Sequence, residues 1–485
     1  MITSLKTAWD WFTSIPHLAS VALALYLVYL VWLAGYIVLQ KREPVATLSW
    51  ILCLAALPYA GLLIYYLLGP QKIRRQNIRR GRHRDDMSSY RAVCPVDENA
   101  SELSKVAQST TGLPPSTATS LQWLVDGGNA YPAILDAVRQ ARHHIHLMYY
   151  IYTPGQNGTA LRDALIERAK AGVQVRLLID AIGSSKVRKA FLQPLRAAGA
   201  EVVWFHPSQL LQPFKRPWMN LRTHRKLVIV DGQVAFTGGI NITDEQDERI
   251  RPDAYRDLHL RVEGKVVHSL QLVFVEDWLY ASGQGRQVFE PDRLWPSMPH
   301  PGPHSIQAQV LISGPDSGWE TIHRLHVAAI QEARRRVWLV TPYFVPGEAA
   351  RMALTSAALG GLDTRLLVPK RSDSLLVTLA ARSYFDELLA AGVRIYEYGP
   401  RMLHTKAFIA DDHLSIVGSA NFDHRSFRLN FELSMMIRDK AVTAELEQLL
   451  QAEFERAVEV TPARQRSLWR DRLPEGFARL ASPLL

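Results

Sequence analysis

The sequence predicts an α/β protein of two similar lobes, each a mixed sheet flanked by helices, that follow an N-terminal two-helix transmembrane hairpin. Three observations lead to this prediction. Two long apolar runs open the chain, a series of segments occurs twice in the same order, and the pattern of His, one residue, Lys, four residues and Asp also occurs twice. A chain of 485 residues is long enough to hold all of these parts.

The first apolar run is residues 17–40, which contain no Asp, Glu, Lys or Arg. A helix needs about 20 apolar residues to cross a hydrocarbon core of about 30 Å, so this run is long enough. The second run is residues 45–69, and only the segment "KREP" separates it from the first. A signal peptide has a shorter apolar core of about 7–15 residues after a basic start. We therefore expect residues 1–70 to form a hairpin of two spanning helices; a pair of buried core helices is the alternative.

A basic segment comes directly after the second run. Its positive residues are Lys72, Arg74, Arg75, Arg79, Arg80, Arg82 and Arg84. Positive charge close to a membrane span favours the cytoplasmic side, so we expect both chain ends and everything after residue 70 to lie in the cytoplasm. The same residues could bind anionic headgroups, and we interpret residues 71–118 as a basic juxtamembrane segment and linker.

The whole chain is also basic, with 56 Lys and Arg against 46 Asp and Glu and a pI of about 9.5. This excess suggests an anionic partner, and both nucleic acid and phospholipid carry the required charge. Charge alone does not separate these two partners, and it is equally compatible with a basic surface that has no special partner.

Internal similarity begins after the linker. Three segments of the first half align without gaps with three of the second half: 137–155 with 329–347, 162–180 with 351–369, and 195–207 with 388–400. Each copy alternates an amphipathic helix with a short apolar strand, as in "ALRDALIERAKAG" followed by "VQVRLLID". We therefore place the first lobe at 119–295 and the second at 305–460. A basic amphipathic tail, 461–485, either lies on a bilayer or packs as a helix on the second lobe.

The doubled motif consists of "HRKLVIVD" and "HTKAFIAD". Its charged residues are His224, Lys226 and Asp231 in the first copy, and His404, Lys406 and Asp411 in the second. Each copy opens a predicted β-hairpin, in which residues i and i+2 share one face of the strand. The His and Lys of each copy therefore point the same way. An imidazole beside an ammonium is unfavourable unless the two share an anion, and a phosphate is a suitable one.

Small residues and an Asn follow each hairpin, and an acidic residue comes later in a similar setting. These residues are Gly239, Asn241 and Asp257 in the first copy, and Ser419, Asn421 and Glu432 in the second. A glycine lets a ligand approach the backbone closely, and an Asn amide can donate to a phosphoryl oxygen. A carboxylate bonded to the far nitrogen of each His would fix its tautomer and raise its basicity.

With these motifs the chain resembles the phospholipase D superfamily, whose signature is a doubled His-Lys-Asp motif, and more narrowly the bacterial cardiolipin synthases. The resemblance rests on "NLRTHRKLVIVDGQVAFTGGINI", "TPYFVPG" and "LHTKAFIADDHLSIVGSANFDHRSFRLNFE", while "REPVATLSWILCLAALPYAGLLIYYLLG" resembles their membrane module. It implies two phospholipase D-type lobes that meet face to face and pool their motifs in one site.

The resemblance also implies roles for the site residues. His224 would be the nucleophile that forms a phosphohistidine and His404 the general acid and base, although the local sequence leaves this order open. The lysines and asparagines would stabilise charge on the phosphoryl oxygens, and Asp231 and Asp411 would brace the turns without touching phosphorus.

The implied activity is that of a phosphatidyltransferase in the bacterial inner membrane, multi-pass, with cytoplasmic catalytic lobes. One phosphatidylglycerol donates its phosphatidyl group to another, giving cardiolipin and glycerol, with no cofactor and no metal. Expected partners are phosphatidylglycerol and other anionic phospholipids, and no nucleic acid. The alternatives are a phospholipase D-type phosphodiesterase that hydrolyses phospholipids, a membrane-tethered nuclease, and a scaffold without activity. The loops "ITDEQDERIRPDAY" and "TPGQNG" depart from the usual family pattern, so the acceptor alcohol stays open. The sequence also leaves the oligomeric state open.

Overall fold

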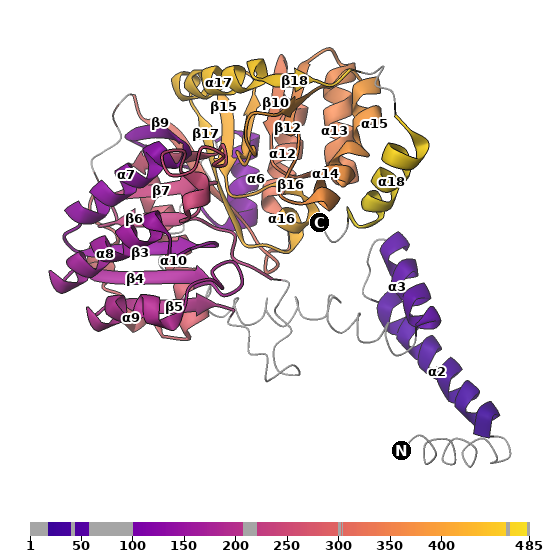
Figure 1. Cartoon of the computed structure of the whole chain (residues 1–485), viewed down its shortest axis with the longest axis horizontal. Helices are drawn as coiled ribbons and strands as arrows, with labels where there is room; N and C mark the ends of the chain where they lie inside the picture. The colour runs from indigo at the N-terminus through magenta and orange to yellow at the C-terminus, as the bar shows by residue number, and fades with distance from the viewer. Residues whose placement is uncertain are drawn as a thin grey trace. The chain divides into compact units, whose positions relative to one another are not determined.

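The computed structural model describes residues 18–39, 44–57, 100–206, 221–298, 302, 304–461 and 466–482 (Figure 1). The chain divides into two compact units, Met1–Arg74 and Arg75–Leu485. The first unit contains α2 (Leu18–Val38) and α3 (Pro44–Ala56). These two helices pack through Leu33, Ile37 and Leu54. None of the helices in the described ranges combines the length and the apolar character that crossing a membrane requires.

The described residues therefore do not support the predicted transmembrane hairpin, and they cover it only in part. Helix α2 covers residues 18–38 of the first run, 17–40, whereas helix α3 covers the beginning of the second run, 45–69. The rest of the second run, from residue 58 onward, and the basic cluster at 72–84 lie outside the described residues.

The first lobe is built on a seven-stranded mixed sheet in the order β2-β8-β7-β6-β3-β4-β5. Strands β3, β4 and β5 run parallel, and the other neighbours are antiparallel. The central strands are buried at nearly every position, as expected for parallel strands covered on both faces. The strands are β2 (Ser120–Val125), β3 (His144–Tyr149), β4 (Gln174–Asp180), β5 (Glu201–Phe205), β6 (Leu227–Val230), β7 (Val234–Gly238) and β8 (Leu258–Glu263).

The second lobe repeats this arrangement. Its nine-stranded sheet has the order β1-β9-β17-β15-β14-β10-β12-β13-β18, and without the outermost strands β1 and β18 it matches the first sheet position by position. The predicted repeat of two mixed sheets is confirmed. The strands are β1 (Ser116–Ala118), β9 (Ile306–Ser313), β10 (Arg336–Val340), β12 (Asp363–Pro369), β13 (Arg394–Tyr398), β14 (Ala407–Ala410), β15 (Leu414–Gly418), β17 (Glu432–Arg438) and β18 (Ala457–Glu459), with β11 (Phe344–Val345) and β16 (Phe422–Asp423) as a separate pair.

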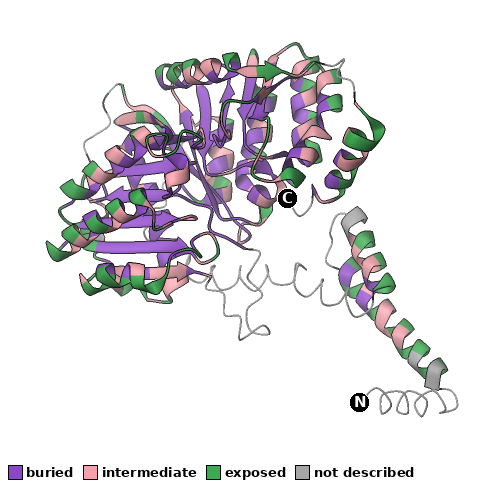
Figure 2. Ribbon diagram, viewed as in Figure 1, coloured by how far each residue is buried: buried purple, intermediate pink, exposed green. Residues whose placement is uncertain are grey.

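Helices cover both sheets, and buried residues fill the space between the layers (Figure 2). The outer face of the first sheet packs against α7 (Asp126–Gln140), α8 (Gln156–Lys170) and α9 (Lys189–Ala197). The inner faces of both sheets share one core with α10 (Val266–Ser282) and α17 (Lys440–Glu455). The outer face of the second sheet packs against α6 (Glu102–Thr111), α12 (Thr321–Glu332), α13 (Glu348–Leu359), α14 (Leu375–Arg382) and α15 (Phe385–Ala390). The remaining short elements are η1 (Asp244–Gln246), η2 (Arg286–Val288), α11 (Pro291–Leu294), α16 (His424–Arg428), the π-helical turn η3 (Leu468–Arg472) and α18 (Leu473–Leu480).

The prediction of a linker up to residue 118 is wrong for its last part, because α6 and β1 belong to the second lobe. The Ser101 hydroxyl caps α6, and Gly112 ends the helix with a φ of 71°. Leu103 and Ala107, one helical turn apart, are buried in the core of the second lobe. Strand β1 then pairs with β9. The polar composition of this segment concealed α6 and β1. A few apolar residues are enough to hold them in place, because a neighbouring helix and strand cover those residues.

Candidate active site

Both His/Lys/Asp motifs lead into the predicted hairpins, β6–β7 and β14–β15. Each His and Lys lies just before the first strand, since β6 begins at Leu227 and β14 at Ala407. The turns start with Asp231 and Asp411, which have left-handed φ values of 53° and 57°. Aspartate is among the few residues other than glycine that adopt this conformation readily.

The two turn aspartates brace the hairpins, and their hydrogen bonds do not go to the motif histidines, His224 and His404. Asp231 accepts hydrogen bonds of 2.8, 2.8 and 2.9 Å from the backbone N–H groups of residues 142–144, where β3 begins. Asp411 accepts equivalent bonds from residues 334–336, where β10 begins. Each carboxylate therefore ties its turn to the start of the adjacent strand, which is the kind of contact that a bracing role requires.

The motif segments extend into the opposite lobe. The backbone N–H of His224 donates to the carbonyl of Phe431 at 2.9 Å, and that of His404 donates to the carbonyl of Arg256 at 2.7 Å. Phe431 and Arg256 each directly precede the acidic residue of their own lobe. Each of the two motif histidines is thereby placed beside the acidic residue of the opposite lobe.

The histidine–carboxylate pairs consequently cross between the lobes. His224 Nδ1 lies 3.0 Å from Glu432 Oε2, and His404 Nδ1 lies 2.6 Å from Asp257 Oδ2. Burial lowers the pKa of His224 to about 4 against the opposing charge of Glu432, and it also lowers the pKa of His404. Burial raises the pKa of each carboxyl, but the facing lysine and histidine outweigh it and hold the pKa of Asp257 and Glu432 below its usual value.

Both lysines are buried and bonded to the histidine of their own motif. Lys226 Nζ donates to the His224 carbonyl at 2.6 Å. Lys406 Nζ donates to the His404 carbonyl and lies 2.8 Å from His404 Nδ1. Burial lowers the pKa of Lys226 to about 7 and that of Lys406 to about 8, and the charge of Lys406 lowers the pKa of Lys226 further. An anionic phosphodiester between the two ammonium groups would offset both desolvation and repulsion.

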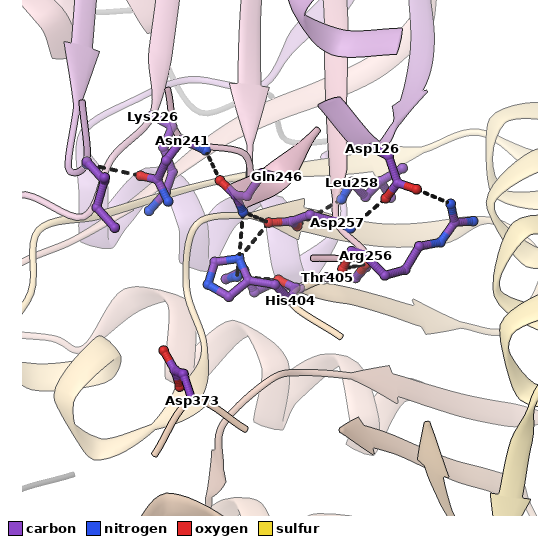
Figure 3. A network of polar contacts seen from close by, with 12 residues as sticks. Asp126, Lys226, Asn241, Gln246, Arg256, Asp257, Leu258, Asp373, His404 and Thr405 are labelled. Atoms are coloured by element: carbon purple, nitrogen blue, oxygen red, sulfur yellow. Dashed lines mark hydrogen bonds and ion pairs between the residues drawn. The ribbon is translucent and has the colours of Figure 1, made fainter. Parts of the chain in front are cut away.

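The small residues after the hairpins lie against the carboxylates that pair with the histidines. A Cβ added to Gly239 would lie 2.1 Å from Asp257 Oδ1, so a larger residue would displace that carboxylate. In the second lobe the Ser419 hydroxyl donates to Glu432 Oε2 at 2.5 Å. Asn241 Oδ1 accepts from the backbone N–H of Ile151 at 3.1 Å, an orientation that leaves its Nδ2 donor for another partner (Figure 3).

A further carboxylate holds the Asp257 pair in place (Figure 3). Asp126 accepts a 3.0 Å hydrogen bond from the backbone N–H of Asp257. It also pairs with Arg256 at 2.8 Å and with Arg401 of the second lobe at 2.6 Å. The position of Asp257 is therefore fixed by contacts from both lobes.

Comparison with known proteins assigns the family. The family model described as "Cardiolipin synthase, PLD-like domain" matches residues 134–256 and 327–457, and each match contains one complete His/Lys/Asp motif. The chain belongs to this family of phospholipase D-like proteins. A second model, "Phospholipase_D-nuclease N-terminal", matches residues 24–70.

Relatives in the phospholipase D-like family align along most of the chain. It is 36% identical over 480 residues to cardiolipin synthase 1 of Bacillus cereus, covering 95% of this chain and 93% of that protein. It is 38% identical over 475 residues to the cardiolipin synthase of Geobacillus sp. WCH70, covering 94% and 92%. The crystal structure of a phosphatidylserine synthase from Haemophilus influenzae has the same fold, with a TM-score of 0.59 at 13% identity, covering 79% of this chain and 100% of that one.

The structure adds Gln246 and Ser426 to the residues that the motif predicted for this phospholipase D-like site. Gln246 Oε1 accepts from the backbone N–H of Asn241 at 2.6 Å, and its Nε2 donates to Asp257 at 2.9 Å. Ser426 Oγ accepts in the same way from Asn421 at 3.2 Å. Both residues follow their Asn by five positions (246 − 241 = 426 − 421), so the internal alignment contained the signal, but a Gln and a Ser did not look equivalent.

Proposed function

We propose that this chain is a cardiolipin synthase, a phosphatidyltransferase that moves a phosphatidyl group from one phosphatidylglycerol to another. The observation that carries the proposal is the pair of buried histidines, each bonded to a carboxylate of the opposite lobe and flanked by a buried lysine. Relatives named cardiolipin synthase, which share 36% to 39% identity with the chain, support this choice over hydrolysis.

In the first step His224 attacks the phosphorus of the donor. Its Nδ1–H donates to Glu432, so the lone pair lies on Nε2, and a pKa of about 4 keeps the ring neutral near pH 7. A bond forms between Nε2 and phosphorus while the bond from phosphorus to the glycerol headgroup breaks. His404 donates a proton to the departing glycerol, and the two lysines stabilise charge on the phosphoryl oxygens.

In the second step a hydroxyl group of another phosphatidylglycerol attacks the phosphohistidine. His404, now neutral, accepts the proton of that hydroxyl, and the bond between phosphorus and Nε2 breaks. Two phosphatidylglycerol molecules thus give one cardiolipin and one glycerol. The bond that is broken supplies the energy for the bond that is formed, so the two steps need no external energy source.

The different carboxylate contacts support this division of roles. The contact of His404 with Asp257, 2.6 Å, is shorter than that of His224 with Glu432, 3.0 Å. A shorter bond to a carboxylate favours the imidazolium form, which the general acid requires. A negative phosphodiester between the lobes would favour that form further.

We propose further that the protein works at the bacterial inner membrane as a multi-pass protein with its lobes on the cytoplasmic side. Apolar side chains of α2, such as Leu25, Val31 and Trp32, are exposed, and lipid would cover them. The basic cluster at 72–84 favours the cytoplasmic side for the lobes that come after it in the chain. Protease should digest the lobes in inside-out vesicles and spare them in intact spheroplasts; the reverse pattern would overturn this topology.

The activity is tested by supplying the purified full chain with isotope-labelled phosphatidylglycerol, with and without phosphatidylethanolamine, and identifying the products by mass spectrometry. We expect cardiolipin and free glycerol in equal amounts, and no product from His224→Ala. Phosphatidic acid as the only lipid product would contradict the synthase and indicate a hydrolase.

A further inference from the structure

The last described segment of the chain is held firmly against the second lobe. Helix α18 packs on α14 and on the turn η3 that precedes it. The Ser482 hydroxyl lies 2.9 Å from the Tyr384 hydroxyl, and the Arg479 guanidinium lies 4.5 Å from the centre of the Tyr384 ring. Arg466 forms ion pairs with Asp386 and with the buried Glu475. Of the two possibilities for the tail, packing on the second lobe is therefore realised.

This packed segment still exposes large apolar side chains. Trp469 is 77% exposed, Phe477 69% and Leu480 77%. Phe477 and Leu480 are three positions apart and lie on one side of α18, whereas Glu475 and Ala478 are buried on the other. Because α18 is fixed by its buried side, Phe477 and Leu480 cannot turn inward to escape water.

The start of α14, which packs against α18, also exposes large apolar side chains. Leu375, 74% exposed, and Leu376 are its first two residues. We refer to six exposed residues on these packed elements together as the apolar face: Leu375, Leu376, Leu468, Trp469, Phe477 and Leu480.

Exposed basic residues accompany the apolar face. They are Lys370 and Arg371 before α14, and Arg470, Arg472 and Arg479 on the last two helical elements. Aromatic and leucine side chains surrounded by arginine are typical of segments that lie at the surface of an anionic bilayer. A protein partner with an acidic groove would match the charge, but such a partner would not explain the position of the face in the fold.

That position is beside the active site. Asp373 lies two residues before Leu375 and accepts a 2.7 Å hydrogen bond from Tyr343, and its negative charge opposes the lowering of the Lys406 pKa by burial. Figure 3 shows Asp373 on the side of the site toward which His404 points. The loop that enters α14 therefore belongs to both the rim of the site and the apolar face.

We propose that the apolar face is a membrane-docking surface of the second lobe, which seats the rim of the active site on an anionic phospholipid bilayer. The proposal rests on the proposed function only in that the substrates are lipids. A docked face would present phosphodiesters to His404 at the depth of the headgroups, without the need to lift a lipid out of the bilayer.

Site-specific fluorescence on the full chain tests the proposal. The protein has two cysteines, so Cys53→Ser and Cys94→Ser provide a background for one environment-sensitive label. The label is attached after Phe477→Cys, or after Trp469→Cys as a second position on the face. The matched control is Leu359→Cys, since Leu359 is 73% exposed at the end of α13, which leads into the start of β12 at the opposite end of the sheet from Leu375.

In vesicles that contain phosphatidylglycerol, the labels on the face should emit at shorter wavelength and be quenched by spin-labelled lipid, whereas the control should be quenched by aqueous iodide. The effect should weaken in phosphatidylcholine vesicles and after Arg470→Gln with Arg472→Gln. Labels on the face that are as accessible to iodide as the control would overturn the proposal. Protection that depends on protein density and not on lipid charge would also overturn it, because it would indicate a second copy of the chain.

Rates on vesicles and on monomeric substrate distinguish an effect on membrane docking from an effect on the catalytic step. Trp469→Ser with Phe477→Ser should lower the rate on long-chain phosphatidylglycerol vesicles at least fivefold and leave the rate on monomeric short-chain phosphatidylglycerol unchanged. Equal losses on both substrates would contradict the docking role. The fluorescence readout does not use catalysis, so it stands or falls independently of the proposed activity.

Discussion

Glu432→Gln changes the partner of His224 by one charge while its shape stays nearly the same. The carboxylate receives three donors: His224 Nδ1 at 3.0 Å, Ser419 Oγ at 2.5 Å and Asn430 Nδ2 at 3.3 Å. A carboxamide has only one oxygen, so its NH2 group must face one of these donors. A hydrogen bond to a charged group contributes about 1.5–3 kcal/mol. If that bond is lost in the transition state, kcat should fall about 10- to 150-fold.

The same substitution should change the pH profile. Glu432 is the strongest influence that opposes the lowering of the Lys226 pKa, which already lies at about 7. Without this negative charge the pKa of Lys226 falls further, and the alkaline decline of kcat/KM should move to lower pH. Initial rates of cardiolipin formation between pH 5 and 9 measure both effects on one preparation.

Glu453→Gln is the matched control for Glu432→Gln. Glu453 is also buried and forms an ion pair between the lobes, with Arg256, but it does not contact either histidine. This variant should lose thermal stability and keep kcat within about threefold of the wild type. The role given to the His224–Glu432 pair would be refuted if Glu432→Gln kept the rate and pH profile of the wild type, or if Glu453→Gln lost as much activity as Glu432→Gln.

Three further predictions concern the lysines, the glycine beside Asp257 and a turn aspartate. In the wild type, kcat/KM should decline as pH rises through about 7 to 8, because Lys226 and Lys406 lose the charge that binds a phosphodiester; a pH–rate profile that is flat to pH 9 would contradict this. Gly239→Ala should lower kcat about tenfold or more, because its Cβ would displace Asp257 from His404, and unchanged kinetics would exclude that contact as important. Asp231→Ala should lower the free energy of unfolding by about 1–3 kcal/mol, measured by denaturant titration, with a much smaller effect on kcat; a loss of activity without a loss of stability would instead indicate a role in the chemistry.

Much of the fold could be predicted because the chain repeats itself. A pattern that occurs twice fixes the strand order of one lobe once the other is known, and the hairpin turns at Asp231 and Asp411 were visible as turn residues between apolar runs. Helix α6 was missed because its few apolar residues do not form a long apolar pattern in the sequence and are buried only by contact with α12 and β9. Its cap, Ser101, and its terminator, Gly112, were present in the sequence as local signals.

The site was predictable residue by residue but not in its pairing. The motif identified the histidines, lysines and acidic residues, yet nothing local indicates that His224 is bonded to Glu432 and His404 to Asp257 across the lobes. Each histidine lies beside the carboxylate of the other lobe because its backbone pairs with a segment that is distant in the sequence. Gln246 was missed although it lies at the same distance from its Asn as Ser426, because a Gln and a Ser did not look equivalent and the contact of Gln246 with Asp257 depends on the loop conformation.

Trapping the covalent intermediate tests the central claim most directly, namely that histidines from opposite lobes act on a single lipid phosphodiester. Wild-type protein is mixed with labelled phosphatidylglycerol, quenched within milliseconds at alkaline pH, digested, and mapped by mass spectrometry. The account predicts a phosphatidyl group on the peptide that contains His224. A modified His404 peptide would reverse the assigned roles, and the absence of any histidine adduct during active turnover would contradict the mechanism itself.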